Sequence, residues 1–215
     1  MIKQETKVYI FDVDGTLIDS MGGWWKVLPQ YLDERGISYP PDLMKRIIAL
    51  GLPGVAHYYK ENFPVRETEA EILQHIVATF KKKYAEEFAA KPHAKETLLA
   101  LKARGVKVCV LTAGMHVLFD DCLKRLGLWE LIDHCWSSDD FPAKKSEPAI
   151  YQMVAQRLGV SVDECVMVDD SPGAIKPAKA AGMQTVAIYD EYSKQHETEM
   201  REMADRYIYD LQELI

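Results

Sequence analysis

This sequence has few cysteines, and no two of them are closely spaced. It holds four cysteines, Cys109, Cys122, Cys135 and Cys165, with no CxxC pair among them. Cys109 and Cys165 fall inside apolar segments, where free thiols are commonly buried. The scattered cysteines therefore predict neither a disulfide framework nor a cysteine metal site, and they fit a reducing cytoplasm.

The sequence also lacks a surplus of basic residues and a segment long enough to cross a membrane. Its formal net charge is −7, which gives no electrostatic reason to expect nucleic acid or an anionic membrane as a partner. The longest apolar runs have the length of a strand, far below the roughly 20 residues of a membrane span. Residues 1–5 carry an acid and no apolar stretch, so we expect no signal peptide and a cytoplasmic protein.

Residues from about 16 to 90 show no strand pattern and predict a small helical bundle. Helices are expected over 24–36, over about 41–50 and from about Pro53 onward. The clearest helix has apolar residues recurring at helical spacing: Ile72, Leu73, Ile76, Val77, Phe80, Tyr84 and Phe88.

Outside this bundle, helices and strands alternate. Five apolar segments have the length of buried strands: 8–11, 106–111, 134–137, 164–168 and 185–188. Alternation of this kind predicts the α/β class, with a parallel sheet covered by helices on both faces. We expect residues 1–16 and 92–215 to form the α/β core, and residues 17–91 to form an inserted helical domain.

Two aspartates, Asp12 and Asp14, directly follow the first strand and precede a Gly-Thr turn. In an open parallel sheet, ligands sit just beyond the carboxyl ends of the strands. Side chains two apart in an extended segment point the same way, so both carboxylates can share one ligand. Because like charges repel, a hard divalent ion such as Mg²⁺ is the favoured ligand. An acidic turn without function is the alternative for a DxD motif taken alone.

Polar residues follow two further strands and one loop. Thr112-Ala113-Gly114 and the pair Asp169-Asp170 each come after an apolar strand, and Lys144-Lys145 precede an expected helix. Because the carboxyl ends of parallel strands share one edge, we expect these groups to converge there. A hydroxyl, backbone N–H groups and a lysine form an anion cradle, while the acids form a metal site with Asp12. Taken singly, each has an ordinary explanation as a turn, a surface lysine or a helix cap; together they favour function.

The order of these motifs resembles that of the haloacid dehalogenase-like hydrolase superfamily. It is most similar to the branch with a helical cap inserted after the first motif, the phosphoglycolate phosphatase and β-phosphoglucomutase-like proteins. The likeness covers essentially the whole chain. It implies a Rossmann-like three-layer core, a mobile cap, Mg²⁺ and an aspartyl-phosphate intermediate.

The resemblance also implies roles for individual residues. Asp12 corresponds to the nucleophile and Asp14 to the general acid and base. Thr112, Ala113 and Lys145 correspond to the residues that bind the phosphate, with Lys145 neutralising charge.

For the metal, the resemblance implies Asp12 and Asp170 as direct ligands. Asp14 corresponds to a ligand through its backbone carbonyl, and Asp169 to a residue that acts through water.

Two departures from the family pattern concern the phosphate-binding groups. The lysine motif usually reads Gly-Lys-Pro-x-Pro, whereas here it is Lys144-Lys145-Ser146-Glu147-Pro148. The spacing to Pro148 selects Lys145, and Lys144 is the alternative. Where the family often has asparagine after the threonine, Ala113 offers an N–H but no polar side chain.

The second carboxylate indicates which reaction to expect. A carboxylic acid can protonate a leaving alcohol and then deprotonate the attacking water. A halide needs neither a proton nor a metal, so Asp14 and Asp170 argue against a dehalogenase. We expect a Mg²⁺-dependent phosphatase of a small phosphorylated metabolite, as a monomer or homodimer.

Three other functions fit the sequence less well than a phosphatase does. Sugar phosphomutases of this branch have a histidine ten residues after the second aspartate, where this chain has Trp24, and an arginine in the region of 51–54, where no cation stands. A signalling receiver domain is shorter and has adjacent acids at its first strand. A catalytically silent binding protein of the same fold has no need for Asp14.

Overall fold

A six-stranded parallel sheet forms the centre of the larger of the two compact units into which the chain divides. The computed structural model describes residue 2 and residues 5–215. The sheet has the order β5-β4-β1-β6-β7-β8, and every pair is parallel. Its strands are β1 (Val8–Phe11), β4 (Lys107–Thr112), β5 (His134–Ser137), β6 (Cys165–Asp169), β7 (Gln184–Ile188) and β8 (Arg206–Ile208). The predicted α/β class is confirmed.

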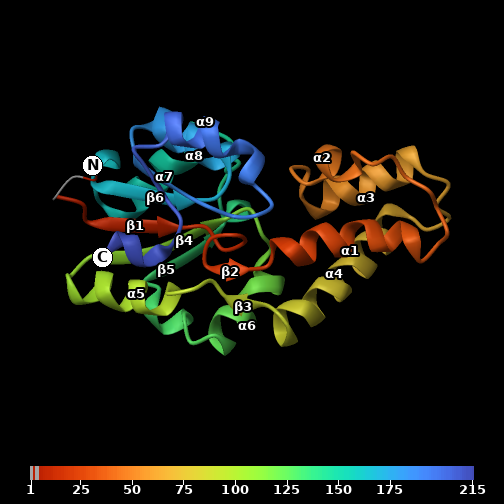
Figure 1. Cartoon of the computed structure of the whole chain (residues 1–215), viewed down its shortest axis with the longest axis horizontal. Helices are drawn as coiled ribbons and strands as arrows, with labels where there is room; N and C mark the ends of the chain where they lie inside the picture. The colour runs from red at the N-terminus through yellow and green to blue at the C-terminus, as the bar shows by residue number, and fades with distance from the viewer. Residues whose placement is uncertain (1, 3–4) are drawn as a thin grey trace. The chain divides into compact units, whose positions relative to one another are not determined.

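Helices cover both faces of this sheet because its central strands are buried on both sides. On one face lie α5 (Ala94–Ala103) and α6 (His116–Arg125). On the other lie α7 (Pro148–Leu158), α8 (Pro172–Ala181) and α9 (Glu197–Met203) (Figure 1). Right-handed crossovers require this division, because the chain moves outward from β1 to β5 and then returns across the sheet to β6.

The largest core cluster packs α7 against the middle of the sheet. Alternate side chains of β1, β4 and β6 meet one face of the helix, and the buried members include Val8, Ile10, Cys109, Leu111, Met167, Ile150, Tyr151 and Val154. This packing fixes the loop before α7 relative to the carboxyl end of β1.

The sheet reverses its order at β1, which has β4 on one side and β6 on the other. Phe11 at the end of β1 pairs with Val110 on β4 and with Val168 on β6. The residues that follow these strands therefore lie at one level. Crevices at such a reversal are where open α/β sheets bind their ligands.

A second compact unit spans Ser20–Phe88, and the rest of the chain forms the first. It contains α1 (Met21–Asp33), α2 (Leu43–Ile47), α3 (Gly51–Asn62) and α4 (Glu69–Glu86). A capping box between Thr68 and Glu71 begins α4. The buried face of α4 consists of Ile72, Ile76, Phe80 and Tyr84, which are the apolar residues at helical spacing.

The prediction of no strand between residues 16 and 90 is wrong. β2 (Ile18–Asp19) and β3 (Ala89–Ala90) pair antiparallel, as a two-stranded ribbon in the first unit. Strands of two residues are too short to show an alternating pattern, so the sequence gives no signal for them.

Short helical turns complete the chain: η1 (Trp129–Leu131), η2 (Ser138–Asp140), η3 (Val162–Glu164), η4 (Lys194–His196) and η5 (Leu211–Leu214). Among the described residues, none of the helices combines the length and apolar character that crossing a membrane requires.

Candidate active site

Asp12 extends β1 by one residue at the point where the sheet reverses. Its N–H donates to the Val168 carbonyl of β6 at 3.0 Å. The chain then turns sharply, because the N–H groups of Leu17 and Ile18 both donate to the Val13 carbonyl, at 3.0 and 2.8 Å. The turn leaves Asp12 buried and Asp14 half-buried.

Gly15 allows this turn to pass directly against Asp170. Its φ is +81°, in the left-handed region that favours glycine. A Cβ at this position would lie 2.7–2.8 Å from the atoms of the Asp170 carboxylate. The next residue, Thr16, is buried and donates from its hydroxyl to Asp170 Oδ1 at 3.4 Å.

Lys145 links the acids that follow β1 and those that end β6. Its Nζ forms a short ion pair with Asp12 Oδ1 and lies 2.7 Å from Asp169 Oδ2. Lys145 is 8% exposed, whereas Lys144 is exposed to solvent. The sequence allowed either Lys144 or Lys145 to be the lysine of the site. In the structure, Lys145 is the one that contacts the acids.

Tyr151 holds the backbone of Lys145 in place. The Tyr151 hydroxyl lies 2.7 Å from the Lys145 carbonyl oxygen and 3.0 Å from that of Ala174 on α8, so its proton is shared between them. Pro148 occupies the first turn of α7, where it fixes the approach of the loop. Sequence reasoning missed Tyr151, because a buried tyrosine on an apolar helix face looks like an ordinary core residue.

Three buried carboxylates surround this lysine. Asp12, Asp169 and Asp170 each offer an oxygen, and these atoms lie within 4.8 Å of one another. Burial raises the pKa of Asp12 to about 7, with Lys145 opposing and Asp169 and Asp14 adding to the rise. Burial also raises the pKa of Asp170 well above its ordinary value, and Asp169 and Asp12 raise it further.

This cluster fits a divalent cation. One buried lysine leaves three close carboxylates with an excess of negative charge, and their oxygens are the hard ligands that Mg²⁺ and Ca²⁺ prefer. The close approach of Gly15 to Asp170 keeps the backbone of the turn beside the same carboxylate.

The predicted phosphate loop follows β4 at the same level. The buried Thr112 hydroxyl accepts a hydrogen bond from the Gly114 N–H at 3.0 Å, so its own proton is available to donate to an anion. Ala113 is exposed. A Cβ placed on Gly114 would lie 3.4 Å from Asp14 Oδ2, so the loop runs beside the Asp14 carboxylate.

Ser137, at the end of β5, supports this loop and was also missed from the sequence. Its hydroxyl donates to the Gly114 carbonyl at 2.7 Å and accepts from the Asp139 N–H at 3.2 Å. Its position at a strand end was the available signal.

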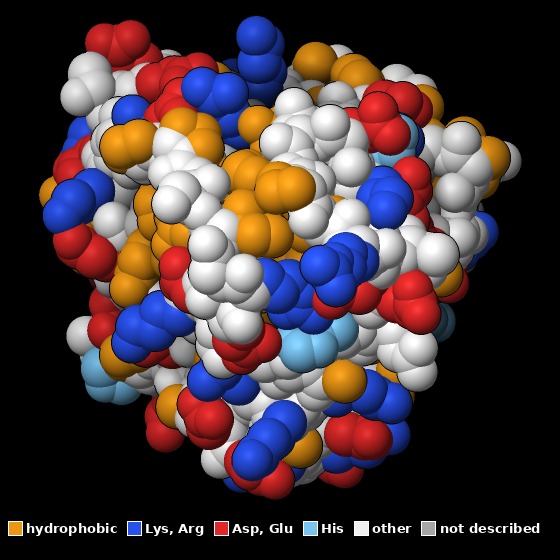
Figure 2. All heavy atoms as spheres, turned by 90° about the vertical axis from the view of Figure 1, so that its right-hand side faces the viewer, with side chains coloured by type: hydrophobic (Ala, Val, Ile, Leu, Met, Phe, Trp, Pro, Cys, Tyr) orange, Lys and Arg blue, Asp and Glu red, His pale blue; other side chains and the backbone are white. Residues whose placement is uncertain are grey.

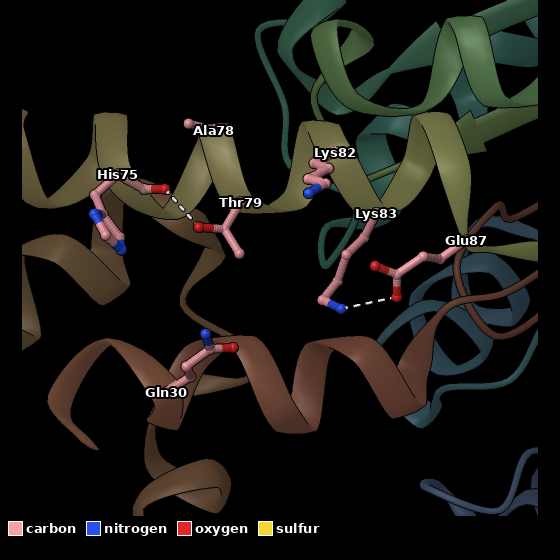
Figure 3. A pocket seen from close by; sticks show the side chains of 7 residues that line it. All are labelled: Gln30, His75, Ala78, Thr79, Lys82, Lys83 and Glu87. Carbon is pink, nitrogen blue, oxygen red and sulfur yellow. Dashed lines mark hydrogen bonds and ion pairs between the residues drawn. The ribbon is translucent and has the colours of Figure 1, made fainter. Parts of the chain in front are cut away.

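The hollow in Figure 3 lies elsewhere, within the helical unit. Its lining comes from α1, from α4 and from Glu87, the residue that follows α4: Gln30, His75, Ala78, Thr79, Lys82, Lys83 and Glu87. The acid among them, Glu87, is paired with Lys83 at 2.9 Å. The hollow therefore lacks the cluster of acids that metal binding or attack on phosphorus requires.

The buried acids and the buried lysine lie at the reversal of a parallel sheet, where α/β enzymes bind their ligands. The chain belongs to the haloacid dehalogenase-like hydrolase family, whose model matches residues 6–182. The expected family and the expectation of an enzyme are confirmed.

The relatives of this chain include named phosphatases. It is 28% identical over 190 residues to a phosphoglycolate phosphatase of Neisseria meningitidis, covering 86% of this chain and 81% of that protein. It is 32% identical over 198 residues to a phosphoglycolate phosphatase of Rhodospirillum rubrum, covering 88% and 82%. The crystal structure of CbbY from Rhodobacter sphaeroides in complex with xylulose-1,5-bisphosphate has a TM-score of 0.82 at 21% identity, covering 97% and 96%, and shows the same fold.

Metal binding should stabilise the protein through Asp170. At about 100 times its Kd, Mg²⁺ is expected to raise the Tm by about 5–10 °C. In Asp170→Asn the shift should fall below about 2 °C, because one ligand is lost. The metal-free Tm of this variant should be no lower than that of the wild type, because charged Asp170 is unfavourable in the folded cluster.

Differential scanning fluorimetry with and without chelator measures these shifts. Asp121→Asn is the matched control, since Asp121 is 88% exposed and pairs with Lys124 on the surface. An equal Mg²⁺ shift in all three proteins contradicts a metal site at Asp170.

Proposed function

We propose that this chain is a phosphatase that hydrolyses small phosphorylated metabolites through an aspartyl-phosphate on Asp12. The observation that carries the proposal is the Asp12 carboxylate, ion-paired with buried Lys145 at the point where the sheet reverses. The names of the phosphoglycolate phosphatases among its relatives support a small phosphorylated substrate.

In the first step, an Asp12 oxygen attacks phosphorus and the bond from phosphorus to the ester oxygen breaks. Asp14 gives its proton to the departing alcohol. Lys145, the Thr112 hydroxyl and the Ala113 N–H bind the phosphoryl oxygens, on which charge accumulates in the transition state.

In the second step, Asp14 takes a proton from water, whose oxygen attacks phosphorus. The bond between phosphorus and Asp12 breaks, which releases inorganic phosphate and restores the carboxylate. One residue serves as acid and then as base because the first step leaves Asp14 deprotonated.

Mg²⁺ is the proposed cofactor. Asp12, Asp170 and the Asp14 carbonyl would hold it directly, and Asp169 would act through water. When bound, it neutralises the charge of the phosphate and of the surrounding carboxylates.

We propose a small molecule as the partner, rather than nucleic acid or a membrane, and a cytoplasmic location. Figure 2 shows positive and negative side chains interspersed on one face, without a broad basic patch, and the net charge is −7. A monomer or homodimer remains the proposed state.

We also propose that residues 17–91 act as a cap that gates the site. The two segments that connect the core to residues 20–88 lie side by side. Ile18 pairs with Ala90, and the Lys91 N–H donates to the Leu17 carbonyl at 2.9 Å. Lys91 also forms an ion pair with the buried Asp190 at 2.7 Å, which anchors the base of the ribbon to the core. Hinges are therefore expected on the far side of this ribbon, next to Asp19 and Ala89.

Asp12→Asn should abolish turnover while preserving the fold. An amide is a poor nucleophile toward phosphorus, so the rate should fall by at least about 10⁴-fold. Hydrolysis of a panel of metabolite phosphates with Mg²⁺ measures the loss, and circular dichroism checks the fold. In crystals, beryllium fluoride should bind within bonding distance of the wild-type Asp12. Activity near the wild-type level in the variant contradicts the assignment of Asp12 as the nucleophile. Beryllium fluoride bound elsewhere in the wild-type crystal contradicts it too.

Lys145 and Lys144 form a matched pair of neighbours for a second test. Lys145→Ala should lower turnover by about two to three orders of magnitude, the scale of losing one oxyanion donor. Lys144→Ala should lower it by less than about tenfold, because a rim charge only steers an anionic substrate. Steady-state kinetics at saturating Mg²⁺ ranks them, and the reverse ranking contradicts the assigned role of Lys145.

Cap gating predicts that the part of the cap beyond these hinges, residues 20–88, moves as a rigid body when a phosphate analogue binds, since the chemical step must exclude water and the substrate must enter. Small-angle scattering and crystals with and without beryllium fluoride measure the movement. Identical cap positions in both states argue against gating.

A further inference from the structure

His116, the first residue of α6, is held by an acid at each ring nitrogen. Its Nδ1 lies 2.9 Å from Asp120 Oδ1 on the same helix, and its Nε2 lies 2.9 Å from Asp140 Oδ2 in η2. A carboxylate can only accept a hydrogen bond, so both contacts are satisfied together only when both ring nitrogens carry a proton. The geometry therefore selects the charged imidazolium.

The surroundings within the first unit favour this charge. Burial alone would lower the pKa of His116, but the hydrogen bonds and charges of Asp140 and Asp120 outweigh it and raise the pKa above 6.5. Arg157 of α7 is a cation near this pair, and it donates to the Asp140 carbonyl at 2.9 Å. Asp139 adds a further acid in η2. A positive charge at the start of a helix is otherwise unfavourable, so the two acids are what stabilise it here.

A continuous set of hydrogen bonds leads from His116 to the loop of residues 112–114. The same Asp140 Oδ2 that meets His116 also accepts from the Ser137 N–H at 2.9 Å. Ser137 then donates to the Gly114 carbonyl at 2.7 Å, and Gly114 donates to the Thr112 hydroxyl at 3.0 Å. With the backbone from Gly114 to His116, these contacts close a ring.

We propose that His116 is a positioning residue whose charged form fixes the loop of residues 112–114 for phosphate binding. The inference rests on the proposed function of that loop. His116 contacts Asp120, Asp140 and the Phe119 ring rather than the acid cluster, so it acts through Asp140 and Ser137.

The direction of the pH dependence follows from the protons. Below the pKa of His116 both nitrogens donate and the ring of contacts is closed. Above it, one nitrogen has lost its proton and faces a carboxylate, so repulsion opens the contact with Asp120 or Asp140. Phosphate affinity should therefore fall as the pH rises through the pKa of His116.

The test measures the Kd of inorganic phosphate by calorimetry at saturating Mg²⁺ from pH 5.5 to 9. His116→Gln keeps a polar side chain and cannot titrate. Relative to this variant, the wild type should lose affinity by a factor of about five to ten as the pH rises, the lower range of coupling between sites. Inorganic phosphate itself titrates in this pH range, but it does so equally in the measurements on the wild type and on His116→Gln. The ratio of the two Kd values therefore does not contain this effect. His196→Gln is the matched control, because His196 also has a helical acid partner, Glu199 at 3.5 Å, and lies outside the ring.

Asp120→Asn provides a second, milder variant. It removes a negative charge that contacts His116 but leaves Asp140 and Ser137 in place. The pH midpoint of the His116 titration, and with it the midpoint of the loss of phosphate affinity, should therefore move to lower pH. Proton NMR of the His116 ring measures the same midpoint without phosphate or turnover, and we expect it above 6.5 in the wild type.

Phosphate binding with the same pH dependence in the wild type and His116→Gln overturns this inference and leaves the proposed function standing. A titration midpoint at or below pH 6.5 for the His116 ring of the wild type also overturns this inference and leaves the proposed function standing. Absence of both phosphate binding and ester hydrolysis at every pH overturns the proposed function, and this inference with it.

Discussion

A lysine buried between two aspartates, Lys145 between Asp12 and Asp169, sets the electrostatic condition that the rest of the site must meet. Burying charges is unfavourable unless they are paired and hydrogen-bonded. One lysine partly offsets the negative charge, and Asp170 adds another acid to the cluster. The site therefore favours a bound cation. A negatively charged phosphate group is expected to bind only together with that cation.

The fold supplies the rigidity that this arrangement needs. Equal register of β1, β4 and β6 brings their ends to one level. The packing of α7 and the Tyr151 hydroxyl fix the backbone of Lys145. Neither acid–lysine contact depends on a flexible surface side chain, because Asp12, Lys145 and Asp169 are all buried. Preorganised charges of this kind need no rearrangement when a phosphoryl group arrives.

Much of this could be predicted from the sequence, and the omissions have physical reasons. Apolar strands ending in polar residues predicted the sheet and the meeting of Asp12 with Asp170, because parallel strands share one carboxyl edge. The choice between Lys144 and Lys145 depends on which side chain the loop turns inward, which no local periodicity encodes.

Other features could not be predicted because their signal is tertiary. Tyr151 and Ser137 look like a core residue and a turn residue until their hydroxyl partners are known. The ribbon of β2 and β3 is too short to show alternation. The segment after Ile188, which forms α9 and β8, has few buried apolar residues to reveal its period.

The central claim is that phosphate is carried covalently on Asp12. Rapid acid quench of the enzyme during turnover of a phosphate ester, followed by borohydride reduction and peptide mass spectrometry, identifies an acyl phosphate by the residue that becomes reduced. The account predicts reduction at Asp12, dependent on substrate and Mg²⁺. Steady turnover with no reduced residue, or with reduction at another acid, contradicts it.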